Sequence, residues 1–155
     1  GFRNQRSCKT IKDDTAGMVT SKTVQRDIYN ALRGSELARN ISGRIYYDGT
    51  RERDSMLEDV EVVFTYGTTD GQTASGVVTL LVYFPDVDPY GNGVMVEDIA
   101  RAMELEALCA AFVDEVKVSM TNYKIGLRQS IMTQSQTEIN QHFVSVMLSY
   151  ETIEN

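Results

Sequence analysis

The chain has 155 residues and a formal net charge of −7, with 22 acidic and 15 basic side chains. This length suits one ordinary domain. The acidic balance and the scattered basic residues argue against a protein that binds nucleic acid by neutralising phosphates, which needs clustered Lys and Arg. Two distant cysteines, Cys8 and Cys109, are too few for a disulfide scaffold, so we expect reduced thiols and an intracellular protein. No apolar run is long enough to span a membrane, and we expect no membrane partner.

The first third of the chain predicts a polar extension, a helix and a short strand. Residues 1–20 are polar and aperiodic, so we expect an N-terminal extension there and a single domain over residues 21–155. Ser21 can cap a helix, and apolar residues then recur at helical spacing up to Gly34. A short strand is expected at Arg44–Tyr47.

Two strands are predicted to form a hairpin in the middle of the chain. Apolar and polar residues alternate from Val60 to Tyr66, which is the period of a half-buried strand. A turn signal at Thr68–Gly71 then leads into the apolar run Val77–Phe84. Because both faces of this second strand are apolar, we expect it to lie in the centre of the sheet.

A long helix and two further strands complete the predicted fold. The helix is expected at about Met95–Lys117, and the strands at Lys124–Arg128 and Phe143–Tyr150, with a flexible or protruding polar link at Thr133–Asn140 between them. The order is helix, strands, helix, strands. We therefore predict an α+β fold, a single domain with a mostly antiparallel sheet and two helices packed on one face. The apolar stripe of the long helix is predicted to contain Ile99, Ala102, Met103, Cys109, Phe112, Val113 and Val116.

The loop between the apolar strand and the long helix resembles a calcium-binding loop in its spacing. A Gly stands at position six of an EF-hand count, but Tyr90 at position five and Gly93 at position eight depart from that pattern, and a strand leads into the loop. Two interpretations stay open: a calcium site, or a plain strand-to-helix connection with acids near a helix N-terminus. The four candidate ligands, at positions one, three, seven and twelve, are Asp86, Asp88, Asn92 and Glu97.

Catalytic sets are not apparent in the sequence. His142 is the only histidine, and no nucleophile motif accompanies it, so we expect a surface or edge-strand residue. Cys109 lies on the apolar helical stripe, which predicts a buried and unreactive thiol. We expect no enzyme activity and no cofactor. A hydrolase that uses acids near His142 is the remaining enzymatic hypothesis.

Several features favour assembly with other subunits. Tyrosines, which are enriched at protein interfaces, lie in the predicted strands and their loops. Two polar stretches, Arg51–Asp59 and Thr133–Asn140, are expected to be solvent-exposed loops without chemistry of their own. The candidate interface residues are Arg51, Arg53, Asp54, Tyr66, Tyr90 and Gln134.

The order of elements and several short segments resemble the tail-completion (tail terminator) proteins of long-tailed phages and the related small proteins of prophage tail modules. The resemblance covers about residues 20–152 and leaves the N-terminal extension out. The segments that carry it are the helix Val24–Leu32, Ile45-Tyr46-Tyr47 with the charged loop after it, Gly76-Val77-Val78-Thr79-Leu80, Phe84-Pro85-Asp86, the helix with Ile99 and Met103, and Gln141-His142-Phe143-Val144.

This resemblance implies an α+β subunit that forms a ring, a hexamer in that family, which caps the tail tube or joins it to the head. Its partners would be copies of itself and other tail or connector proteins, and it would be a virion component assembled in the bacterial cytoplasm. No catalytic residues carry over. DNA would be passing cargo only, since an acidic lumen repels phosphates and lets DNA slide through.

Overall fold

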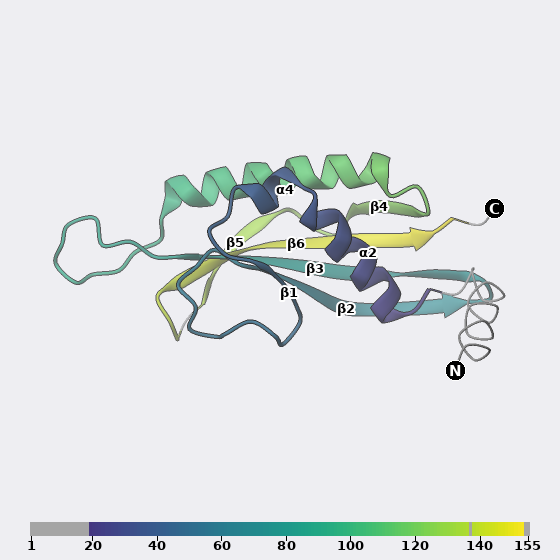
Figure 1. Ribbon diagram of the computed structural model, residues 1–155, viewed down its shortest axis with the longest axis horizontal. Helices are drawn as coiled ribbons and strands as arrows, with labels where there is room; N and C mark the ends of the chain where they lie inside the picture. The colour runs from purple at the N-terminus through teal and green to yellow at the C-terminus, as the bar shows by residue number, and fades with distance from the viewer. Residues whose placement is uncertain (1–18, 137, 154–155) are drawn as a thin grey trace, which may run out of the picture.

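In the computed structural model, which describes residues 19–136 and 138–153, one long sheet is covered on one face by helices (Figure 1). The predicted α+β class and the order helix, strands, helix, strands are confirmed. The extension predicted for residues 1–20 falls almost entirely on residues 1–18, which lie outside the described ranges. No helix in these ranges is both long enough and apolar enough to cross a membrane.

The first helix, α2 (Ser21–Arg33), lies against β1 and β2 and is strongly amphipathic. Its inward residues at positions 24, 28 and 32 are completely buried. Thr20, rather than Ser21, occupies the N-cap position, and its side chain forms no capping hydrogen bond. A single turn, α3 (Glu36–Arg39), follows, and the hydroxyl of Ser35 accepts a hydrogen bond from the backbone of Ala38 at its start.

The sheet has the strand order β1-β2-β3-β6-β4, and β5 pairs with β6 on the same side as β4. All pairs are antiparallel except β1 with β2, which run parallel. The predicted central position of the second hairpin strand is confirmed, because β3 lies between β2 and β6. The strands are β1 (Ile45–Tyr47), β2 (Val60–Asp70), β3 (Thr73–Pro85), β4 (Tyr123–Leu127), β5 (Met132–Gln136) and β6 (Gln141–Thr152).

The turn between β2 and β3 lies slightly later than predicted. The strand β2 continues to Asp70, and the two-residue turn is formed by Gly71 and Gln72. Gly71 has a φ of +64°, which suits a glycine in a tight hairpin. The extra strand residues pair with the start of β3, so the β2–β3 hairpin is longer than predicted.

The long helix, α4 (Ile99–Ser119), packs on β4, β5 and β6, and Asp98 caps it by accepting a hydrogen bond from the backbone of Arg101. The prediction was wrong for two residues of its apolar stripe, since Ile99 is 65% exposed and Met103 is 68% exposed. At about 100° per residue, both project about 90° or more away from the buried direction. The buried face is instead Ala102, Leu105, Cys109, Phe112, Val113 and Val116.

The polar link predicted at Thr133–Asn140 is another correction. Residues Met132–Gln136 form the strand β5, which pairs antiparallel with the first half of β6. The hydroxyl of Thr133 donates a 2.7 Å hydrogen bond to Glu106 on α4, which ties this strand to the helix layer. Polar side chains suit the position because β5 is an edge strand, where the backbone ladder rather than apolar burial holds the segment.

Candidate functional site

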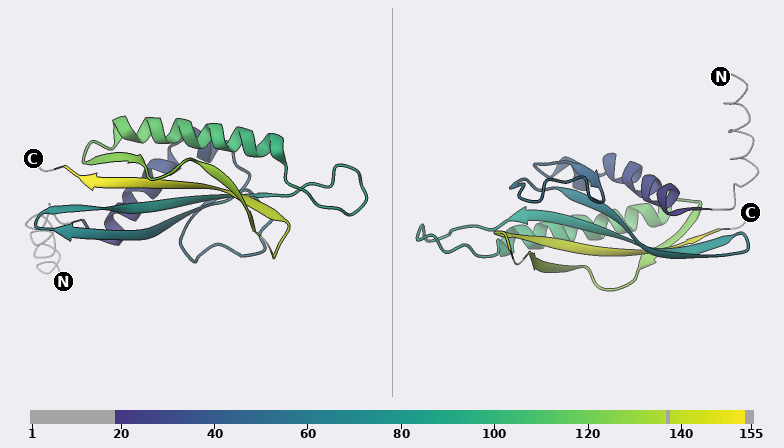
Figure 2. Two further views of the ribbon diagram at one scale, coloured as in Figure 1. Left: turned by 180° about the vertical axis from the view of Figure 1, so that it is seen from behind. Right: turned by 90° about the horizontal axis from the view of Figure 1, so that it is seen from below.

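Residues 86–98, which we call the arm, extend past the end of the sheet between β3 and α4 (Figures 1 and 2). Two backbone hydrogen bonds of 2.9 Å join Val87 and Val96 near its base. At its tip, the carboxylate of Asp88 accepts hydrogen bonds from the backbone amides of Asn92 and Gly93, at 3.2 and 2.9 Å. The arm therefore has a defined shape although it stands away from the core.

The tip of the arm exposes apolar side chains. Tyr90 is 84% exposed and Val94 is 56% exposed, and Val96 and Ile99 continue the exposed apolar surface toward α4. Tyrosine side chains combine a large apolar area with few rotatable bonds, and they are enriched at protein interfaces. An ordered segment that presents such groups to water has the chemistry of a binding element.

His142 on β6 holds both ends of the arm. Its Nδ1 lies 2.6 Å from Asp86 Oδ1, and its Nε2 lies 3.5 Å from Glu97 Oε1. Because a carboxylate only accepts, the Nδ1–H group donates the short hydrogen bond. The expected surface or edge-strand location was wrong, since β6 is an interior strand and His142 is largely buried beside Phe84.

Replacing His142 with phenylalanine is expected to loosen the arm while keeping an aromatic ring beside Phe84. Loss of a hydrogen bond to a charged group costs about 1–3 kcal/mol of folding free energy. Amide hydrogen exchange should therefore become faster in residues 86–98 and change little at the far end of β3. Protection of the arm equal to that of the wild type would contradict the anchoring role.

The arm is also the segment with calcium-like spacing, and the structure assigns each candidate ligand a protein partner. Asp86 and Glu97 contact His142, and Asp88 accepts backbone amides within the tip. The side-chain oxygen of Asn92 accepts the backbone amide of Val94, at 3.0 Å. In residues 19–136 and 138–153, no cluster of three or more His, Cys, Asp or Glu is arranged to hold a metal ion.

The C-terminal end of the arm is held in place through the start of α4. The guanidinium of Arg101 forms a two-point ion pair with Glu58, with Nε–Oε2 at 2.7 Å and Nη2–Oε1 at 2.9 Å, and it also donates to the carbonyl of Asn40. The hydrogen bonds that Arg101 donates to Glu58 are the main reason that the pKa of Arg101 is raised above its ordinary value. Arg101 lies three residues after the end of the arm. Its ion pair therefore ties the start of α4 to the segment before β2.

One predicted interface residue, Arg51, is buried instead. Its side chain is 4% exposed and forms an ion pair with Asp59, itself 1% exposed, with Nε and Oδ2 2.9 Å apart. Nη2 donates further hydrogen bonds to the carbonyl of Ser55 and to Gln141 Oε1, at 3.1 and 3.0 Å. The loop Arg51–Asp59 was expected to be solvent-exposed, but the side chains at both of its ends are buried. The buried carboxylate of Asp59 provides the counter-charge that the buried guanidinium of Arg51 needs.

Aromatic stacking completes this buried network. The guanidinium carbon of Arg51 lies 3.9 Å from the ring centroid of Tyr83, whose hydroxyl donates a 2.7 Å hydrogen bond to Glu61. Burial, followed by the hydrogen bond to Glu61, raises the pKa of Tyr83 above its usual range. Every buried side-chain nitrogen and oxygen in the described ranges has a hydrogen-bond partner, which indicates that this network serves to hold the fold.

The other candidate interface residues lie on the surface. Arg53 pairs with Glu138 in solvent, and Asp54 is exposed beside it. Tyr66 on β2 is 47% exposed, and Gln134 is exposed on the edge strand β5. These four residues are spread over several elements, so the structure does not gather them with Tyr90 into one patch.

The sequence analysis considered two side chains for catalysis, Cys109 and His142. Cys109 is buried on α4, as predicted, and this burial raises the pKa of its thiol to about 12, which favours the protonated form at neutral pH. The sequence analysis did not predict that His142 anchors the arm, because its two carboxylate partners are distant in sequence. The one signal in the sequence was that His142 is the only histidine of the chain. No protein-family model matches this chain, and no curated protein is significantly similar to it in sequence.

Proposed function

We propose that this chain is a non-enzymatic structural protein of a phage or prophage, a tail-completion (tail terminator-like) subunit. In this proposal it assembles into a ring at the tail tube or at the head–tail junction, and it acts through shape and interfaces. The acidic net charge of −7 suits a ring through which DNA passes without being bound.

The observation that carries the proposal is the anchored arm with its exposed apolar tip. His142 and Arg101 hold the two ends of the arm in place, and Tyr90 and Val94 face solvent. Preorganised binding elements lose little conformational entropy when they meet a partner, so such an arm suits repeated assembly with identical neighbours. The resemblance to tail-completion proteins rests in part on the order helix, strands, helix, strands, and the folded chain has this order with α3 and β5 added.

Light-scattering mass, measured across a series of protein concentrations with calcium and then with chelator, tests the proposal. We expect the mass to rise with concentration toward one closed particle, with a ring visible by negative-stain electron microscopy and no effect of calcium. A chain that stays monomeric and melts at a higher temperature in calcium would favour the alternative, a small ligand- or calcium-binding domain. At a calcium concentration 100 times Kd, that stabilisation would be about 2.7 kcal/mol.

A further inference from the structure

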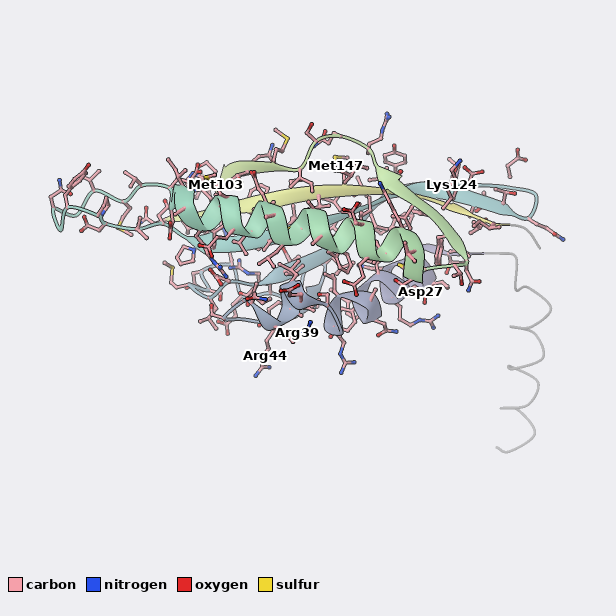
Figure 3. All side chains as sticks on the ribbon, turned by 90° about the horizontal axis from the view of Figure 1, so that it is seen from above. Asp27, Arg39, Arg44, Met103, Lys124 and Met147 are labelled. Carbon is pink, nitrogen blue, oxygen red and sulfur yellow. The ribbon has the colours of Figure 1, made fainter. Side chains whose placement is uncertain are left out.

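The face of the sheet away from the helices carries a hollow at the end opposite the arm. Figure 3 shows Lys124 and Met147 on this side, whereas Arg39 and Arg44 project from the helical side. The hollow has a volume of about 370 Å³, in the range of sites that hold a compact ligand group. Its lining includes Tyr66, Val77, Lys124, Gly126, Arg128 and Ser149.

The shape of the hollow follows from small residues on neighbouring strands. Gly126 on β4 and Ser149 on β6 are paired in register, and a Cβ added at Gly126 would lie 3.0 Å from the Ser149 hydroxyl. Val77 lies beneath the hollow and is almost completely buried, so the exposed apolar surface at the hollow comes mainly from Tyr66, which is 47% exposed. An aromatic side chain therefore finds apolar surface in the hollow and small residues at its centre.

The charges of the hollow and of the arm are complementary. Lys124 and Arg128 are exposed at the hollow, and neither forms an ion pair in the described part of the chain, although Glu151 also lines it. The arm presents the exposed carboxylate of Asp88 two residues from Tyr90. A Tyr90 side chain in the hollow would bring that carboxylate toward the two cations.

An arm cannot reach the hollow of its own chain. From Val77 to its end at Pro85 the strand β3 covers about 26 Å at about 3.3 Å per residue, and the arm then continues away from the sheet (Figure 1). The occupant must therefore come from another molecule. A contact between opposite ends of two identical chains is heterologous, and such contacts generate closed rings when the rotation between subunits closes.

We propose that the arm of one copy docks in the hollow of the next copy, with Tyr90 inserted between Tyr66 and Ser149. This inference rests on the proposed ring assembly and names the surfaces that form it. Docking covers the apolar tip of the arm, and it repeats at every subunit boundary of the ring.

Two variants test this contact from its two sides. Tyr90→Ser removes the aromatic ring from the arm but leaves the hollow intact, and Ser149→Tyr fills the hollow but leaves the arm intact. Each variant alone is expected to associate about 30-fold more weakly or worse, as at an interface hot spot. Mixed together, the two variants should form a dimer of one chain of each kind, because a single functional arm and a single functional hollow remain.

Matched controls separate docking from damage to the fold. Val118→Ser removes an equally exposed apolar residue from the end of α4, and Met147→Tyr adds an aromatic ring two residues from Ser149 on the same sheet face. Both controls should assemble like the wild type, and all four variants should keep the wild-type melting temperature within a few degrees.

Three results would overturn the inference. The first is wild-type assembly by either test variant, and the second is a mixture of folded test variants that forms no dimer. In both cases a ring of wild-type chains would leave the proposed function standing and reject only the arm–hollow contact. The third is a wild-type chain that stays monomeric at every concentration, which would count against the contact and the ring together.

Discussion

Replacing Asp59 with alanine is expected to destabilise the folded chain by about 3–5 kcal/mol, because it leaves the buried guanidinium of Arg51 without its counter-charge. Asp59 accepts hydrogen bonds from Arg51 Nε, from the hydroxyl of Ser55 and from the backbone amide of Arg44, all within 2.9 Å. The substitution breaks all three. Urea denaturation followed by circular dichroism measures the change in the free energy of unfolding.

Asp54 provides the matched control for this experiment. It is a carboxylate of the same loop, exposed to solvent, so Asp54→Ala should change stability by no more than about 0.5 kcal/mol. A loss below about 1 kcal/mol in Asp59→Ala would show that water reaches Arg51, and that the network around it is not a closed, buried one.

Replacing Gly76 with alanine is expected to cost about 1–3 kcal/mol or more through overpacking. An added Cβ would overlap the carbonyl oxygen of Tyr66 and would lie 2.6 Å from the Cα of Gly67 and 2.9 Å from the hydroxyl of Tyr150. Two of these three neighbours are backbone atoms of β2, so the clash is relieved only by shifting the paired strands. Thermal unfolding should show a lower midpoint.

Gly34 offers a contrasting glycine in the same chain. It ends α2 with a φ of −94°, and nothing lies within 4 Å of an added Cβ. Gly34→Ala should therefore be neutral, or stabilising by up to about 1 kcal/mol, because it reduces the freedom of the unfolded chain. Equal effects at the two positions would mean that the loss at Gly76 comes from backbone flexibility and not from the overlap of the added Cβ with β2 and Tyr150.

The contrast between Arg51 and Tyr90 shows where sequence patterns reach their limit. Both residues lie in polar, irregular segments, and both were predicted to be interface residues, Arg51 as part of a polar loop and Tyr90 as a tyrosine in a loop. Arg51 is buried because Asp59, Gln141 and Tyr83 meet around it from different elements, whereas no such set of partners surrounds Tyr90 at the arm tip. Polarity along the chain does not distinguish the two cases.

The sequence by itself determined the α+β class, the order of the elements and the central position of β3, because helical and strand periodicities are local and β3 is apolar on both faces. Only the tertiary structure decided which polar residues make hydrogen bonds and ion pairs within the protein. It brings His142 between Asp86 and Glu97, pairs β5 with β6, and opens a hollow beside Lys124 and Arg128. The His142 contacts and the hollow depend on contacts between segments far apart in the chain, about which a pattern read over neighbouring residues carries no information. The strands β5 and β6 are adjacent in sequence, but the polar residues of β5 carry no apolar alternation that would mark a strand.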